Sequence, residues 1–129
     1  MNVPDLEAPI VPGRSLGGVE VGAPPGELLG SSRRPRVEIG PVVVWLSEGI
    51  VHQVGARAGY RGLVLGTGIG LGSSLADVER ELGRVVEDEE DNLVVEGCPG
   101  LVLETEAWSG ESLRANLQAR LSQIMVTHG

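Results

Sequence analysis

Residues 42–54 read VVVWLSEGIVHQV, and this stretch decides the fold. Two runs rich in valine, 42–46 and 50–54, flank the turn-forming residues 47–49, a pattern typical of a β-hairpin. Both faces of the first run are apolar, so that strand is either covered on both sides or presents Trp45 to an interface. Because tryptophan is enriched at binding hot spots, Trp45 is a candidate for contact with a partner.

The hairpin belongs to a pattern that occurs twice along the chain. The matching segments are 18–22 with 68–72, 37–44 with 95–102, and 51–54 with 121–124. We expect the two glycine-rich segments to be short strands, each leading into a helix. The spacing between matching residues grows along the chain, so the second copy contains insertions around the acidic run 87–91 and at 107–120.

The clearest helix signal begins at Ser74. Ser74 and Asp77 resemble a capping box, in which each side chain accepts a hydrogen bond from the backbone N–H of the other residue. Leu75, Val78 and Leu82 lie on one face of the helix that follows. A weaker helix is expected around 24–30, in the first copy.

These patterns predict an α+β fold of two tandem diverged repeats, each a short helix packed on an antiparallel sheet. We expect a single domain over residues 1–129, with repeat one at about 14–58 and repeat two at about 62–128. A chain of this length buries enough surface to fold without disulfides, and its lone cysteine, Cys98, excludes an intramolecular one.

The charge and hydropathy of the chain narrow the classes of partner. A net charge of −8 argues against nucleic acid or an anionic membrane. The longest apolar runs fall far short of the roughly 18 residues that a membrane-spanning helix needs, and the first residues do not resemble a secretory signal. We therefore expect a cytoplasmic protein.

No motif predicts a catalytic, cofactor-binding or metal site. The segment GTGIGLG (66–72) looks like a dinucleotide-binding loop, but its glycines alternate with apolar residues, which is the period of a strand. Cys98 would need a base, and only His52 and His128 are available. These two histidines and the acidic residues have no recognisable metal-ligand spacing.

One segment resembles a known family. Residues 71–83, LGSSLADVERELG, are similar to the helix entry of BamE-like lipoproteins and of the tandem β-lactamase-inhibitory protein, and to small bacterial toxin-immunity proteins. The resemblance implies a tandem helix-on-sheet fold and a role in binding another protein.

The leading hypothesis is an intracellular protein-binding module, an immunity or inhibitor protein that neutralises a toxin or enzyme by masking its surface. A basic toxin or enzyme fits the acidic charge, and a homo-oligomer remains open. The alternatives are a structural or self-assembling protein without catalysis and, ranked last, a small hydrolase. The candidate partner-binding residues are both tryptophans and seven acids: Trp45, Trp108, Glu87, Asp88, Glu89, Glu90, Asp91, Glu104 and Glu106.

Overall fold

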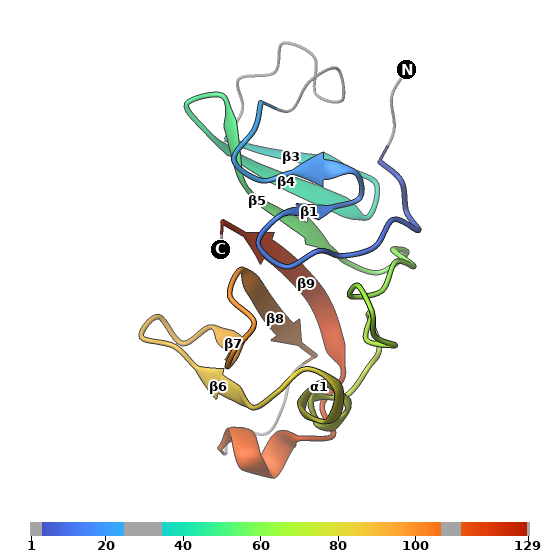
Figure 1. Ribbon diagram of the computed structural model, residues 1–129, viewed down its shortest axis with the longest axis vertical. Coiled ribbons are helices and arrows are strands. Elements are labelled where there is room, and N and C mark those ends of the chain that lie inside the picture. Colours follow the sequence, from blue (N-terminus) through green and yellow to red (C-terminus); the bar gives the residue numbers. More distant parts are fainter. Residues whose placement is uncertain (1–3, 25–34, 107–111, 129) are drawn as a thin grey trace.

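The computed structural model describes residues 4–24, 35–106 and 112–128. Its main feature is a seven-stranded antiparallel sheet that twists progressively from one edge to the other (Figure 1). In sheet order the strands are β3 (Arg36–Ile39), β4 (Val42–Ser47), β5 (Ile50–Ala56), β9 (Leu121–Thr127), β8 (Leu101–Thr105), β7 (Leu93–Val95) and β6 (Val85–Glu87). The remaining elements are a two-stranded sheet of β1 (Ser15–Leu16) and β2 (Val19–Glu20), the helix α1 (Leu75–Glu81) and the 3-10 helix η2 (Leu113–Asn116).

The hairpin predicted at 42–54 is confirmed as β4 and β5. The two strands pair from Val42 opposite Ala56 to Ser47 opposite Ile50. The connecting residues, Glu48 and Gly49, have φ angles of 54° and 78°. Positive φ at both central residues defines a type I′ turn, whose twist matches that of the flanking strands.

The prediction of two helix-on-sheet repeats is wrong. β5 and β9 pair directly, from Gln53 opposite Thr127 to Ala56 opposite Ile124. This pairing joins the strands of both halves into one sheet over one hydrophobic core. Pairing satisfies backbone N–H and C=O groups that two separate sheets would leave unpaired along their edges. Among the described residues α1 is the only α-helix, and the helix expected around 24–30 lies mostly outside them.

The short strand predicted at 18–22 is present as β2, whereas the one predicted at 68–72 is absent. Segment 18–22 contributes to the tight β1–β2 hairpin. The amide of Gly68 donates to a carboxylate oxygen of Glu81 at 3.0 Å, and that of Gly70 donates to the hydroxyl of Ser73 at 3.1 Å. Because side chains already accept hydrogen bonds from these two amides, the amides cannot pair with a neighbouring strand.

One face of the large sheet forms the core. Along β8, Leu101 and Leu103 point into this core, whereas Val102 between them points to the opposite face. The N-terminal segment, the residues before α1 and α1 itself cover the core face. Their buried residues are Ile10, Leu16, Tyr60, Val64, Ile69, Leu75 and Val78.

Tyr60 fastens the N-terminal segment to this core. Its buried hydroxyl accepts a hydrogen bond from the amide of Gly17 at 2.9 Å and donates one to the carbonyl of Ala8 at 2.6 Å. Desolvation by burial raises the pKa of the Tyr60 phenol.

An ion pair engages the start of β6 at the outer edge of the sheet. Arg114 donates two hydrogen bonds to the carboxylate of Glu79, at 2.8 and 2.7 Å. The same carboxylate accepts the amide of Val85 at 2.8 Å, and Arg114 also donates to the carbonyl of Val85 at 2.7 Å. Arg114 lowers the pKa of Glu79 through these bonds. The Glu79–Arg114 bracket thus gives Val85 the partners that another strand would supply.

The capping box at the start of α1 is confirmed. The hydroxyl of Ser74 accepts the amide of Asp77 at 3.1 Å, and the carboxylate of Asp77 accepts the amide of Ser74 at 3.1 Å. We expect Ser74→Ala to lower the free energy of unfolding by about 1 kcal/mol in urea melts, because a helix amide loses its acceptor. Ser122→Ala, at an exposed serine on β9, is the matched control. Equal losses in the two variants would contradict a capping role.

Candidate functional site

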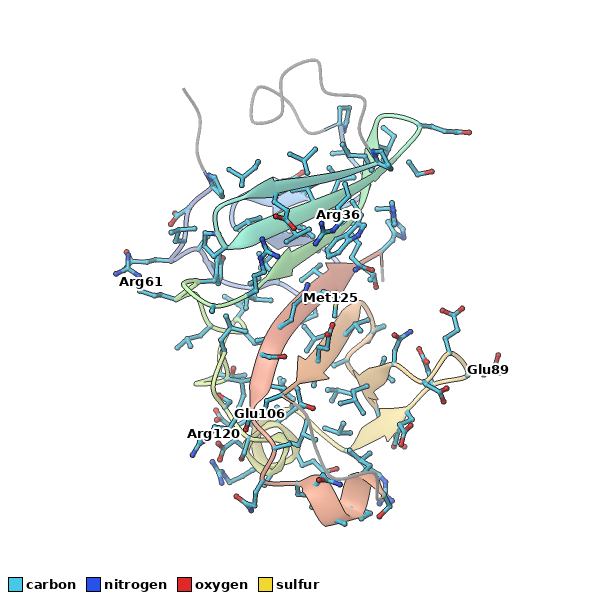
Figure 2. The ribbon with its side chains drawn as sticks, turned by 180° about the vertical axis from the view of Figure 1, so that it is seen from behind. Arg36, Arg61, Glu89, Glu106, Arg120 and Met125 are labelled. Carbon is cyan, nitrogen blue, oxygen red and sulfur yellow. The ribbon has the colours of Figure 1, made fainter. Side chains whose placement is uncertain are left out.

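The face of the sheet opposite the core, the open face, carries one residue of every strand in a single row. Residues paired across neighbouring antiparallel strands project on the same side. Each residue of the row is paired with the next one across neighbouring strands. In sheet order the row consists of Val86, Val94, Val102, Met125, Gly55, Val43 and Glu38. All but Glu38 are apolar or glycine, and these six form the apolar row. Figure 2 views the sheet from this side, with Met125 near its centre and no described helix or strand in front.

The apolar row is covered by side chains at one end and exposed at the other. Val43 is fully buried and Met125 is 8% exposed. A Cβ atom on Gly55 would lie 3.1 Å from the Trp45 ring and 3.1 Å from the Met125 side chain, so these two side chains close over the glycine. At the other end, the three valines of β6, β7 and β8 are only half-buried: Val86, Val94 and Val102.

Trp45 lies half-buried beside the covered end of the row. The Arg36 guanidinium stands 5.6 Å from the centre of its ring. Arg36 also pairs with Glu38 at 2.7 Å, and Arg57 pairs with Glu38 at 3.0 Å. Hydrogen bonding and charge from Arg57, with a smaller effect of Arg36, lower the pKa of Glu38. The charges around Trp45 are therefore largely paired, and the role of Trp45 in an interface stays a prediction.

Beside the half-buried valines the surface is hollowed into an acidic groove of about 390 Å³. Leu93, Val102 and Met125 contribute apolar atoms to its lining. Four of the acids predicted to bind a partner also line it: Glu87, Asp91, Glu104 and Glu106. Within the described part of the chain, no ion pair engages any of these four carboxylates. The Glu106 carboxylate accepts the amide of Arg120 at 3.4 Å. The fold therefore brings together acids without a described ion-pair partner from two segments that are distant in the sequence.

The remaining acids of the run occupy the β6–β7 hairpin. The carboxylate of Asp88 accepts hydrogen bonds from the amides of Asn92 and Glu90, at 2.9 Å each. These bonds lower the pKa of Asp88, and the bond from Asn92 has the largest effect. Asp88 therefore shapes the turn, in which Asp91 has a φ of 64°. Glu89 lies at the tip of the hairpin (Figure 2) and, like Glu90, does not line the groove. Trp108 lies outside the described residues.

The structure describes the surroundings of two features weighed for cofactor binding and catalysis, the glycine-rich segment and Cys98. The carboxylate of Glu81 occupies the Gly68 amide that a phosphate would need. Burial raises the pKa of the Cys98 thiol, whereas an activated nucleophile needs a lowered one. In the ranges that the structure describes, no group of three or more His, Cys, Asp or Glu is arranged to hold a metal ion. No helix there is long and apolar enough to cross a membrane.

The three half-buried valines and Met125 were not among the predicted site residues. The signal for them was the alternation along β8, where Val102 and Glu104 alternate with the core residues Leu101 and Leu103. This alternation shows which residues share a face, but it leaves open which face the rest of the chain covers. The apolar row was therefore not predictable without the strand pairing.

Comparisons with known proteins bear on the fold alone. No protein-family model matches the sequence, and no curated protein matches it. The fold is similar to the crystal structure of the uncharacterized protein yfeY from Escherichia coli, with a TM-score of 0.50 and 15% sequence identity. The similarity covers 71% of this chain and 69% of that chain.

Proposed function

We propose that the protein binds another protein through the open face of its sheet and acts as an inhibitor or immunity protein by masking the partner's surface. The observation that carries the proposal is the apolar row beside the acidic groove. Contiguous apolar surface is costly to leave in water and marks interaction sites on soluble domains. An apolar centre with a polar rim is the usual anatomy of a protein interface.

The two parts of the open face contribute differently to binding. Burial of Val86, Val94 and Val102 would supply affinity, at roughly 25 cal/mol for each Å² of apolar surface removed from water. The groove carboxylates would attract a basic partner and speed association, an effect that salt weakens. Every strand of the sheet contributes to the open face. A partner bound there would therefore have a broad area of its own surface masked.

Self-assembly through the same face is the alternative. A two-fold contact uses the same patch on both subunits, so the carboxylates of Glu104 and Glu106, which have no described basic side chain as an ion-pair partner, would add like charge to the interface. A basic partner of different sequence avoids this repulsion. The charge distribution therefore favours a second protein over a second copy of the chain.

The function is tested with one variant on the open face and one at an exposed apolar residue away from it. The immobilised protein is used to capture a partner from the native organism, and the identified partner is then purified and its Kd measured. We expect Val102→Asp to weaken binding about tenfold or more, because it puts a charge into the apolar centre of the interface. Leu65→Asp is the control, since Leu65 is 60% exposed and lies against the N-terminal segment rather than on the open face.

Thermal melts establish that both variants fold, and the partner's own activity shows whether binding inhibits it. Unchanged affinity of Val102→Asp would place the interface elsewhere. Full activity of the bound partner would contradict the inhibitor role while leaving binding intact.

A further inference from the structure

We infer that the segment which occupies the open face is an amphipathic α-helix, with lysine or arginine along one side of its apolar stripe, lying across strands β6 to β9. The inference rests on the proposed function, since it names the element that a protein partner presents. It is argued from the spacing of the apolar row, from the hydrogen bonding of the sheet's backbone and from the side of the row on which the acids lie.

The spacing of the row suits a helix that crosses the strands. Val86, Val94, Val102 and Met125 occupy adjacent strands, and neighbouring strands are about 4.8 Å apart. One turn of an α-helix rises about 5.4 Å. A helix lying along the row therefore places about one apolar residue over each strand, and the residues at i, i+3, i+4 and i+7 form the stripe that faces the sheet.

The hydrogen bonding of the sheet's backbone also favours a helix as the occupant of the open face. The N–H and C=O groups of inner strands are used within the sheet, so they offer no hydrogen bonds to an occupant of the face. An occupant must satisfy its own backbone when it buries apolar surface, and a helix does so internally. Addition of a partner strand at the β6 edge is hindered, because the Glu79–Arg114 bracket already engages the amide and carbonyl of Val85.

The acids lie on one side of the apolar row. β6 and β8 run in the same direction, since each is antiparallel to β7 between them. Glu87 follows Val86 along β6, and Glu104 follows Val102 along β8. Both residues therefore lie beyond the row at the same end of the strands, where the hairpin carrying Asp91 also lines the groove. Glu104 shares the open face with Val102, whereas Glu87 alternates with Val86, pairs with Leu93 and lines the groove from the edge strand β6. A helix that fits would carry basic residues on that flank.

A synthetic peptide tests this inference without knowledge of the natural partner. The probe is a labelled 18-residue peptide with leucine at i, i+3, i+4 and i+7 and lysine along one flank of this stripe. Its controls are a scrambled peptide of the same composition and a striped peptide interrupted by proline. We expect fluorescence anisotropy to show the striped peptide binding about tenfold tighter than either control, and circular dichroism to show helix gained on binding.

Variants of the open face assign the site. Val94→Thr and Val102→Thr keep the shape of the side chain and the strand propensity, so both are expected to fold, which thermal melts verify. Each should weaken binding of the striped peptide several-fold. Glu104→Gln with Glu106→Gln should weaken binding at low salt and flatten its salt dependence. Glu20→Gln with Glu48→Gln, two exposed acids outside the groove, is the matched control and should change little.

Equal binding of the striped and scrambled peptides would overturn the inference, since it would reduce the contact to charge attraction alone. Unchanged binding in both threonine variants would also overturn it. Self-association that Val102→Thr abolishes would assign the face to a second copy and overturn it as well. If no peptide binds while Val102→Asp still loses the captured partner, the helix inference fails and the proposed function stands. If Val102→Asp keeps the partner, the proposed function fails.

Discussion

Gly100→Ala is expected to lower the free energy of unfolding by about 3 kcal/mol or more, whereas Gly97→Ala lowers it by only about 1 kcal/mol. Both glycines lie in the β7–β8 connection with positive φ, 84° at Gly100 and 78° at Gly97. Both variants therefore carry a similar cost for placing alanine in the left-handed region. The difference between the two losses of unfolding free energy therefore measures the steric cost of the added methyl group at Gly100.

That space is occupied only at Gly100. A Cβ atom there would collide with the backbone of Gly13 and lie 2.9 Å from the carbonyl oxygen of Thr127, whereas nothing lies within 4 Å at Gly97. The carbonyl of Gly100 accepts the amides of Gly13 at 3.2 Å and Thr127 at 2.9 Å, so this contact joins the N-terminal segment to the sheet. Urea denaturation of the two variants measures the difference. Equal midpoints would show that the N-terminal segment does not pack closely here.

Leu101→Ala is expected to cost more stability than Val102→Ala, whereas Val102→Ala is expected to cost more binding. Leu101 is 1% exposed and belongs to the core, so its truncation should cost about 2–5 kcal/mol. Val102 is the next residue of the same strand and is half-buried on the open face. Its truncation should cost at most about 1 kcal/mol, because less apolar surface leaves a buried environment. Val102→Ala should nevertheless weaken partner binding more than Leu101→Ala does.

Denaturant melts and binding of the identified partner give the two readouts on the same pair of variants. The binding measurement is made at a temperature where both variants remain folded. If Val102→Ala proves as destabilising as Leu101→Ala, the open face is covered in the isolated protein, and the proposed interface loses its basis.

Short-range signals predicted the β4–β5 hairpin and the start of α1. The hairpin at 42–54 followed from two valine-rich runs around a turn, and the helix start followed from Ser74 and Asp77. In both cases the residues that decide the conformation are neighbours in the chain, so their interactions hold in almost any tertiary setting. The acids of the groove were also recognisable as candidates, because a run of carboxylates can be read without knowing the fold.

The assembly of these elements could not be predicted from the sequence. The matching segments indicated two separate sheets, whereas β5 and β9 pair into one. Pairing between strands far apart in the sequence depends on backbone hydrogen bonds, which are common to all residues and leave little trace in composition. The glycine segments illustrate a related point: the residue pattern of 68–72 suits a strand, but Glu81 and Ser73 take its amides.

The sequence by itself therefore determined the local elements of the protein, namely a hairpin, a capped helix and an acidic chain with a valine-rich core. Tertiary structure alone decided that seven strands join in one sheet, that one face is buried and the other is open, and that Glu87 and Glu104 share a groove. The physical reason is the distance along the chain between the residues that interact. Turns and caps are set by contacts a few residues apart, whereas the open face exists only because long-range strand pairing aligns Val86, Val94 and Val102 across three strands.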